Sequence, residues 1–258
     1  MRVLYAGLTG DDVTAWQNFL RGIKPNSQII VSGSFDALTK SETQDFQKAH
    51  GLGADGSVGP MTMAKALVLG YGSMHDDRHD RSGPNWPAPP DFPPMSFIDR
   101  QKIFGTFAYV AAPVTSNPEA ITITDGWASR NIVTIPVPQL AAVHITSLQF
   151  HHLAASQLQE LFVAWEQAGL LTKILTWGGS WVPRFIRGSR TVLSNHAWGT
   201  AFDINVQWNM LGTTPAMAGQ KGCTRELVEL ANQNGFFWGG HFKGRTDGMH
   251  FECAKLLT

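Results

Sequence analysis

The chain has 258 residues, a length at which one large domain or two smaller ones can bury a hydrophobic core. Its 20 basic and 20 acidic residues give zero net charge, so we expect no nucleic-acid partner, because such proteins usually carry a basic excess. Two cysteines, Cys223 and Cys253, are too few for a disulfide scaffold, and whether they pair stays open. The sequence has no run of about 18 apolar residues and no signal-peptide core. We therefore expect neither membrane insertion nor export by a signal peptide.

An internal repeat near the N-terminus predicts two similar helices. The pair Leu8-Thr9 recurs thirty positions later as Leu38-Thr39. In both copies the threonine stands three residues before an acidic residue, a capping-box pattern that predicts a helix start. After the first threonine, apolar residues recur at helical spacing at Val13, Trp16 and Leu20. With a third short helix expected over 62–69, residues 1–70 are predicted to form a small all-α domain without a cluster of catalytic side chains.

Four motifs in this domain resemble the peptidoglycan-binding domain found on many cell-wall hydrolases. They are VxxWQxxL at 13–20, GSFDxxT at 33–39, FQxxxGL at 46–52 and DGxVGPxT at 55–62. The resemblance spans residues 10 to 63 and implies a wall anchor with peptidoglycan as its partner. The aromatic residues are expected to build the core, and the binding surface is expected in the groove between the helices.

A proline-rich segment follows, and we interpret residues 71–95 as a semi-rigid linker. Six of the 14 prolines lie between Pro84 and Pro94, which favours an extended conformation and excludes a helix interior. The preceding cluster of His75, Asp76, Asp77, His79 and Asp80 has metal-ligand chemistry. A solvated linker is the favoured interpretation, because a metal site needs ligands fixed on packed elements.

Residues 96–258 are predicted to form one α+β domain. In the helix expected over 150–169, the residues at helical spacing predict a core-facing stripe, and Gly169 ends it; the stripe comprises Leu153, Leu158, Leu161, Phe162 and Trp165. A second helix is expected over 225–234. Segments rich in β-branched and alternating residues predict strands at 121–124, 132–135, 174–177, 201–206 and 249–253.

The first chemical motif is SNHAWGTAFDIN at 194–205. As a strand, residues 201–206 place Ala201, Asp203 and Asn205 on one face and apolar residues on the other. If the apolar face packs inward, Asp203 and Asn205 face a cleft. Gly199 lets the backbone turn, so that His196 can return beside Asp203.

The second chemical motif is DGMHFE at 247–252, in which a strand places His250 and Glu252 on one face. Together the two motifs offer two imidazoles and several carboxylates. Two neutral histidines with one carboxylate commonly bind a catalytic zinc and leave a position for water. A further carboxylate can then act as general base.

The joint pattern HxxGxAxD and DxxHFE resembles the LAS-type zinc peptidases of the M15 family. That family includes VanY-type D-alanyl-D-alanine carboxypeptidases and phage L-alanyl-D-glutamate endopeptidases. The resemblance covers about residues 96–258 and is weakest before residue 130. It implies one Zn²⁺ per chain held by His196, Asp203 and His250, with Asp247 as catalytic base. It also implies an upstream arginine that stabilises the oxyanion.

The arginine has two candidates, Arg184 and Arg187, of which Arg184 is slightly favoured because it follows a glycine-rich turn. Ser194 and Glu252 are placed for hydrogen bonds to the ligands, with purely structural roles as the open alternative. His241 is an equally open candidate for the cleft wall. For the remaining candidates, structural roles are favoured: His151 and His152 at a helix start, and Trp198 and Trp238 in the core. A Ser-His-Asp hydrolase is disfavoured because the sequence has no GxSxG motif.

Three functions follow from these features. The leading hypothesis is a phage endolysin: a zinc peptidase tethered to peptidoglycan that cuts the stem peptide, with L-Ala–D-Glu as the expected bond. We expect a monomer that stays in the producing host's cytoplasm until released onto the cell wall. The alternatives are a VanY-type D-alanyl-D-alanine carboxypeptidase and a wall-binding protein without catalysis. The sequence leaves open which stem-peptide bond is cut.

Overall fold

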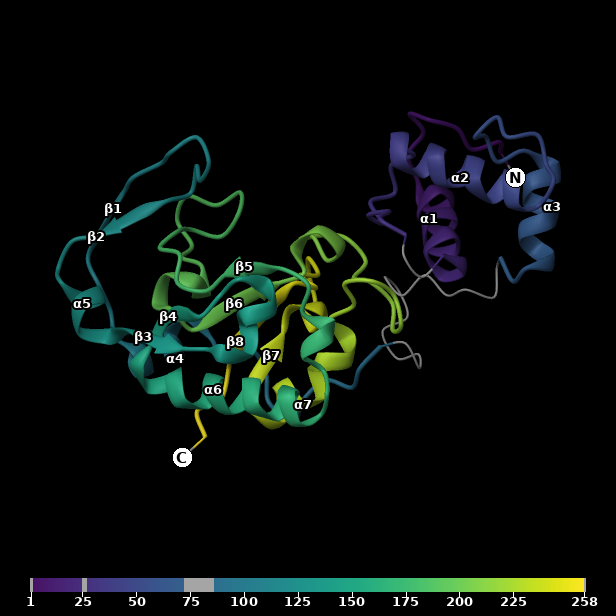
Figure 1. The fold of residues 1–258 in the computed structure, drawn as a ribbon. Coiled ribbons are helices and arrows are strands. Elements are labelled where there is room, and N and C mark those ends of the chain that lie inside the picture. Colours follow the sequence, from purple (N-terminus) through teal and green to yellow (C-terminus); the bar gives the residue numbers. More distant parts are fainter. Residues whose placement is uncertain (1, 25–26, 72–85, 258) are drawn as a thin grey trace.

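The computed structural model describes residues 2–24, 27–71 and 86–257 and shows a three-helix domain and a larger α+β domain (Figure 1). The α+β class with an antiparallel sheet is confirmed. The cluster from His75 to Asp80, with most of the expected linker, lies outside the described residues. None of the described helices combines the length and apolarity that crossing a membrane requires.

The three-helix domain packs its helices around aromatic side chains. Its elements are α1 (Asp11–Ile23), α2 (Ala37–Ala49) and α3 (Pro60–Val68). Val13, Trp16 and Leu20 of α1 are buried, as their spacing predicts. Trp16 meets Phe46 of α2 edge to face, with ring centroids 5.6 Å apart, a geometry that adds to the burial of the two rings. The repeated helices therefore form one core.

The predicted helix starts were wrong. The N-cap of α1 is Gly10, and the N-cap of α2 is Asp36. The Asp36 carboxylate accepts hydrogen bonds from both the backbone N–H and the hydroxyl of Thr39, each at 2.7 Å. Thr39 therefore lies inside the first turn of α2, because an aspartate upstream already caps the helix.

Two glutamines thirty residues apart fasten loops to the repeated helices. The side chain of Gln17 accepts hydrogen bonds from the backbone N–H groups of Ser32 and Gly33. The side chain of Gln47 accepts one from Gly56, and its amide nitrogen donates to the backbone carbonyl of Ser57. Each glutamine thus satisfies backbone groups of a loop that lies outside the strands.

The α+β domain is built around the antiparallel sheet β5-β6-β8-β7. The hairpins β1–β2 and β3–β4 form two further small sheets. Its strands are β1 (Tyr109–Ala111), β2 (Ile121–Ile123), β3 (Ile132–Pro136), β4 (Ser147–His151), β5 (Trp177–Gly179), β6 (Ala201–Ile204), β7 (Phe236–Trp238) and β8 (His250–Cys253). Its α-helices are α4 (Phe97–Phe104), α5 (Trp127–Asn131), α6 (His152–Gln167) and α7 (Val228–Gln233). Short 3₁₀ helices are η1 (Pro138–Val143), η2 (Leu171–Lys173), η3 (Asn195–Trp198), η4 (Val206–Trp208), η5 (Arg225–Leu227) and η6 (Gly239–His241).

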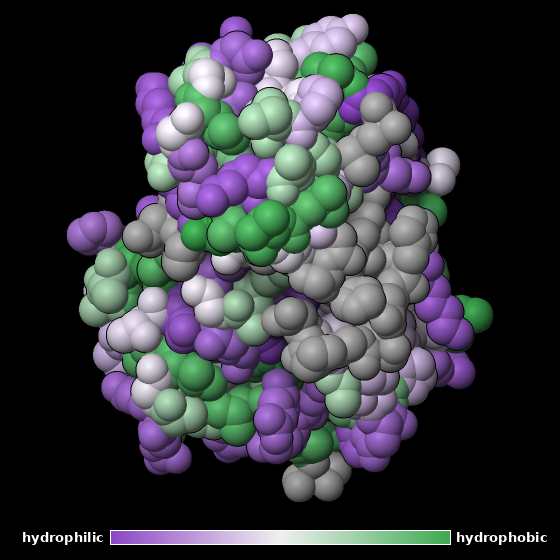
Figure 2. Space-filling model, turned by 90° about the vertical axis from the view of Figure 1, so that its right-hand side faces the viewer, coloured by the Kyte–Doolittle hydropathy of each residue, from purple (hydrophilic) through white to green (hydrophobic). Residues whose placement is uncertain are grey.

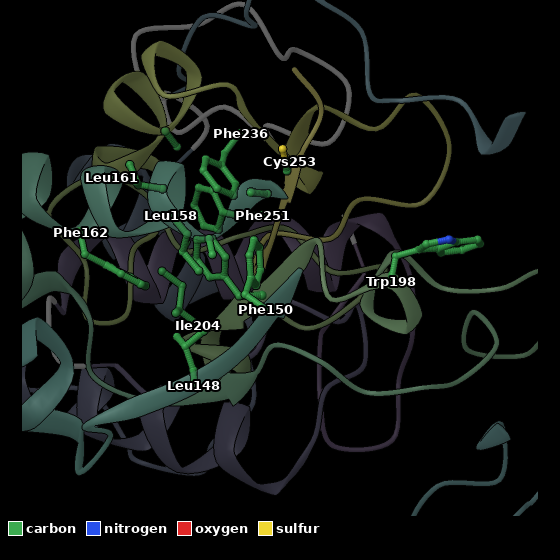
Figure 3. Packing of buried hydrophobic residues seen from close by; sticks show 14 of the residues in the cluster. Leu148, Phe150, Leu158, Leu161, Phe162, Trp198, Ile204, Phe236, Phe251 and Cys253 are labelled. Carbon is green, nitrogen blue, oxygen red and sulfur yellow. The ribbon is translucent and has the colours of Figure 1, made fainter. Parts of the chain in front are cut away.

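One face of the central sheet packs on α6 and forms the core. Figure 3 shows Phe150, Leu158, Phe236 and Phe251 gathered in this core, while Trp198 lies apart from them. Within the sheet, the rings of Phe202 and Phe251 stack with centroids 5.4 Å apart. Because side chains alternate along a strand, burying Phe251 and Cys253 turns His250 and Glu252 to the opposite face. The core thereby sets which side chains of β6 and β8 are left for chemistry.

The helix expected over 150–169 begins at His152, because Phe150 and His151 end strand β4. His151 caps the helix: its Nδ1 accepts the backbone N–H of Leu153. Leu153 is 45% exposed, so its predicted place in the core was wrong, whereas Leu158 and Trp165 are fully buried. Gly169 follows the helix with φ +70, the left-handed conformation that favours glycine after a helix end.

The strand position of Asn205 predicted that its side chain faces the cleft, and this prediction was wrong. β6 ends at Ile204, and Asn205 adopts φ 54. Its buried side chain accepts the backbone N–H groups of Leu175 and Thr176 and donates to the carbonyl of Lys173. The strand expected at 174–177 begins only at Trp177, because the Asn205 side chain, and not a neighbouring strand, binds the backbone N–H groups of Leu175 and Thr176.

The last residues of the expected linker contact the α+β domain. Trp86 is buried against Trp238, with ring centroids 5.4 Å apart, and the guanidinium of Arg225 lies 4.6 Å from the Trp86 ring centroid.

Both cysteines are free and buried, and burial raises the pKa of Cys253 to about 12. Figure 2, which shows the molecule from the side of the three-helix domain, has small apolar clusters separated by polar side chains.

Candidate metal centre and active site

The register of β6 and β8 places Asp203 directly opposite His250. Directly opposite residues on antiparallel strands have neighbouring side chains on the same face. His196 reaches the pair from η3, because Gly199 adopts φ +63 between η3 and β6. A Cβ on Gly199 would lie 2.7 Å from Ile132 Cδ1 and 3.2 Å from the backbone nitrogen of His151. Gly199 therefore meets both a conformational and a spatial requirement of the turn.

Three ligand-type atoms converge in this cluster. Asp203 Oδ1 lies 3.2 Å from His196 Nε2 and 3.0 Å from His250 Nδ1, and the two nitrogens lie 3.2 Å apart. All three residues are buried. The outer ring nitrogens face acceptors: His196 Nδ1 lies 2.6 Å from the carbonyl of Ser180, and His250 Nε2 lies 3.1 Å from Glu252 Oε2. With the protons on the outer nitrogens, both lone pairs face Asp203, which fits the donor set of a metal ion such as zinc.

The electrostatics of the cluster favour a cation. Burial opposes the ionisation of Asp203, but the two imidazoles outweigh it and hold the pKa of Asp203 well below its usual range. Burial likewise disfavours a charged His250, yet Asp203 and Glu252 raise the pKa of His250 to about 10. The buried carboxylates therefore attract positive charge at the point where the lone pairs meet, which a metal ion would supply.

Asp247 lies beside this cluster without a hydrogen-bond partner for one oxygen. Its backbone is fixed, because its N–H donates to the carbonyl of Gly239 and its carbonyl accepts from the N–H of His250. Its Oδ1 is buried and has no partner among the described residues. Burial raises the pKa of Asp247 to about 7, and the charge of Asp203 adds to this effect. A carboxylate with such a pKa can accept and return a proton near neutral pH.

The structure distinguishes the two arginines. Arg187 Nη1 lies 2.6 Å from Glu119 Oε2, so its guanidinium already forms an ion pair. Arg184 makes no ion pair that involves the described residues, and its guanidinium donates to the carbonyl of Phe185. Burial lowers the pKa of Arg184, and the charges of Asp203 and Asp247 oppose that effect. Of these two arginines, Arg184 is the one whose charge interacts with Asp203 and Asp247.

A cleft of about 520 Å³ opens onto the cluster. Its lining contains Arg184, Arg187, Ser194, Asp203, Asp247, His250 and Glu252, together with Gly178, Ile186, Asn195, Val206, Leu211, Phe242, Arg245 and Met249. The structure therefore brings together the predicted site residues, with His196 beneath them. His241 is not in this lining; its Nε2 lies 2.8 Å from the carbonyl of Pro87. Trp198 and Trp238 are buried, as favoured.

A second hollow, of about 450 Å³, lies in the three-helix domain between the C-terminal halves of α1 and α2. Its apolar lining comprises Leu20, Ile23, Phe46, Ala49 and Leu69, and its polar lining comprises Lys24, Glu42, Asp45 and His50. The sequence predicts a binding groove between the helices without naming its residues, and this hollow lies between two of those helices.

Sequence reasoning missed Arg100, Asn195 and Arg245. Arg245 lies on the cleft wall, and its Nη2 donates to the carbonyl of Arg187 at 3.1 Å. Asn195 stands beside His196 in the motif but has no ligand chemistry that would single it out. Arg100 lies about a hundred residues before the cluster, and no local pattern marks it.

Two segments of the chain match models of known protein families. Residues 187–253 match a family model of M15 peptidases described as D-alanyl-D-alanine carboxypeptidase. Residues 9–66 match a family model described as a putative peptidoglycan binding domain. Both predicted resemblances are thereby confirmed: residues 9–66 are similar to peptidoglycan-binding domains, and residues 187–253 are similar to M15 peptidases.

Among solved structures, a peptidoglycan-binding protein from Clostridioides difficile in complex with glutamine hydroxamate is 32% identical to this chain. The match covers 29% of this chain and 46% of that chain, with a TM-score of 0.26. The chain thus spans less than half the length of that protein. No curated protein matches the chain.

The raised pKa of Asp247 predicts a pH-dependent stability of the metal-free protein. Well below pH 4 the carboxyl is protonated in both the folded and the unfolded state. As the pH rises toward 7, only the unfolded chain ionises, so folding loses stability. We expect Asp247→Asn to leave stability unchanged near pH 4 and to raise the free energy of unfolding by roughly 1–3 kcal/mol near pH 8, measured by urea unfolding with a chelator present.

Asp125→Asn provides a control of opposite sign, because backbone N–H groups of Ala108 and Trp127 lower the pKa of Asp125. That variant should lose stability near neutral pH, and its deficit should shrink as the pH falls. Equal stability of wild type and Asp247→Asn from pH 4 to 8 would contradict the raised pKa.

Proposed function

We propose that the protein is a zinc-dependent peptidoglycan peptidase that hydrolyses an amide bond of the stem peptide, with L-Ala–D-Glu as the expected bond. The observation that carries the proposal is the convergence of His196 Nε2, His250 Nδ1 and Asp203 Oδ1 beside an unpartnered carboxylate in an open cleft. The matches to a peptidoglycan-binding domain and an M15 peptidase support peptidoglycan as the substrate.

His196, Asp203 and His250 would hold the zinc ion, one per chain. When bound, such an ion polarises a scissile carbonyl and lowers the pKa of water near it. Asp247 then takes the proton from the attacking water and delivers it to the leaving amine. Its pKa of about 7 suits both transfers, because a group that must accept and then donate works best near the ambient pH.

Arg184 stabilises the negative charge that develops on the carbonyl oxygen. Its guanidinium lines the cleft and is free of the acidic partner that occupies Arg187. It lies on a segment that pairs with the β1–β2 hairpin: Ala120 forms a bridge with Arg184, and the N–H of Ile121 donates to the carbonyl of Pro183. A donor fixed in advance costs little reorganisation when the charge forms.

The three-helix domain would hold the peptidase on its substrate, as an endolysin does. The groove between α1 and α2, with apolar walls and a polar rim, is the candidate contact surface for peptidoglycan. Linking two modules turns the second contact into an intramolecular one and raises the local concentration of the substrate.

A D-alanyl-D-alanine carboxypeptidase is the second candidate, because the matched family model bears that description. Both functions use the same zinc chemistry and differ in the bond that reaches the cluster. Mass spectrometry of purified peptidoglycan, digested with and without a chelator, distinguishes them. We expect new L-alanine C-termini and D-glutamate N-termini that disappear with chelator.

Release of free D-alanine alone would establish the carboxypeptidase instead. A digest without products, from protein that still sediments with the wall, would leave only a binding role. Products that persist undiminished with chelator, after metal removal is verified, would contradict the metal-dependent mechanism.

The different surroundings of the two arginines predict different kinetic effects. Arg184→Ala should lower kcat by about 100- to 1,000-fold, the usual cost of losing an oxyanion donor. Arg187→Ala should lower kcat less than about tenfold, because its guanidinium is engaged by Glu119. Steady-state kinetics on a synthetic stem peptide measures both effects, and a larger loss in Arg187→Ala would reverse the assignment.

A further inference from the structure

A buried charge network connects helix α4 to the proposed metal centre. Glu252 of β8 directs one carboxylate oxygen toward His250 and the other toward Arg100. Its Oε2 lies 3.1 Å from His250 Nε2 and also accepts a hydrogen bond from Asn195 Nδ2. Its Oε1 lies 3.2 Å from Arg100 Nη2. The side chains of Arg100 and Glu252 are each only 1% exposed.

Arg100 also holds the turn that carries His196. Its Nη1 donates to the hydroxyl of Thr200 at 2.5 Å. Thr200 follows Gly199, and its carbonyl accepts the backbone N–H of Cys253 at the end of β8. One guanidinium therefore contacts both chain segments that supply the proposed imidazole ligands, η3–β6 and β8.

Because Arg100 and Glu252 are buried, each needs the other as its charged partner. A buried carboxylate is costly unless it is paired and hydrogen-bonded, and removing one partner of a buried pair leaves an uncompensated charge. Without Arg100, nothing would hold Glu252 Oε1 in place and the carboxylate could turn away from His250, which would weaken its acceptance of the His250 Nε2–H. His250 could then exchange tautomer or rotate its ring, and Nδ1 would no longer present a fixed lone pair to Asp203.

We propose that Arg100 is a positioning residue for the metal centre: it fixes Glu252, which in turn holds His250 with Nδ1 toward the metal. This inference rests on the proposed zinc site and adds a residue that lies outside the segment 187–253 matched by the peptidase family. Removing a residue that hydrogen-bonds to a metal ligand typically lowers the metal affinity 10- to 100-fold. The expected effect of losing Arg100 is of that size.

The test is metal affinity rather than activity. Zinc affinity is measured by competition with a chromophoric chelator in the full-length protein, after the wild type is shown to bind one zinc. We expect Arg100→Met to weaken zinc binding 10- to 100-fold and to alter the visible absorption spectrum of the cobalt-substituted protein. Glu252→Gln, which keeps the side-chain shape, should show the same two changes.

Phe104→Ala is the control for a purely structural role of α4. Phe104 is buried on the same helix, but its side chain takes no part in the Arg100–Glu252 network. Measured well below its melting temperature, this variant should bind zinc within about threefold of wild type, a difference small beside the 10- to 100-fold effect expected for a positioning partner.

Wild-type affinity and spectrum in Arg100→Met would overturn the inference, as would an equal loss of affinity in Phe104→Ala. If Arg100→Met does not fold, Glu252→Gln decides, because unchanged affinity there removes the link from the network to His250. A wild type that binds no zinc would instead overturn the proposed metal centre itself.

Discussion

The cross-strand pair of Asp203 and His250 is the constraint on which the rest of the site depends. The two residues stand opposite each other in the register of β6 and β8, and that register is fixed by the core on the other face. A shift of one residue would turn Phe202 and Phe251 outward and the site residues inward. The same aromatic stacking that stabilises the domain therefore sets the position of the chemistry.

Successive layers of contacts surround this pair. Gly199 returns His196 to it, and the carbonyl of Ser180 and the carboxylate of Glu252 face the outer nitrogens of the two imidazoles. Beyond them, Arg100 compensates the charge of Glu252. Each layer fixes the one inside it, which is the arrangement that a preorganised site requires. Asp247 is different, because its buried Oδ1 has no partner in the described part of the chain, which suits its proposed role in proton transfer.

Much of the site follows from local patterns in the sequence. The two-residue alternation placed Asp203 and His250 on the strand faces that point away from the apolar core, and the glycine before the strand indicated the return of His196. The pattern failed at Asn205, where the backbone takes a positive φ and the strand has ended. It failed at Leu153, which lies in the first turn of α6 and is 45% exposed, and at Thr39 because Asp36 supplies the cap.

Other features depend on contacts that sequence spacing does not contain. The sequence favours Arg184 over Arg187 only slightly, and the ion pair of Arg187 with Glu119, in the connection between β1 and β2, separates the two. Arg100 meets Glu252 after an interval of 152 residues. Such pairs form when distant segments pack together, so neither periodicity nor a short motif predicts them.

The most direct test of the proposed metal centre is the zinc content of the purified full-length protein after dialysis against a zinc buffer, measured by mass spectrometry for metals. The geometry predicts about one zinc per chain in the wild type and in Asp247→Ala, and none in His196→Ala or His250→Ala. A wild type without zinc, or a His196→Ala variant that keeps it, would contradict the assignment of His196, Asp203 and His250 as a metal site.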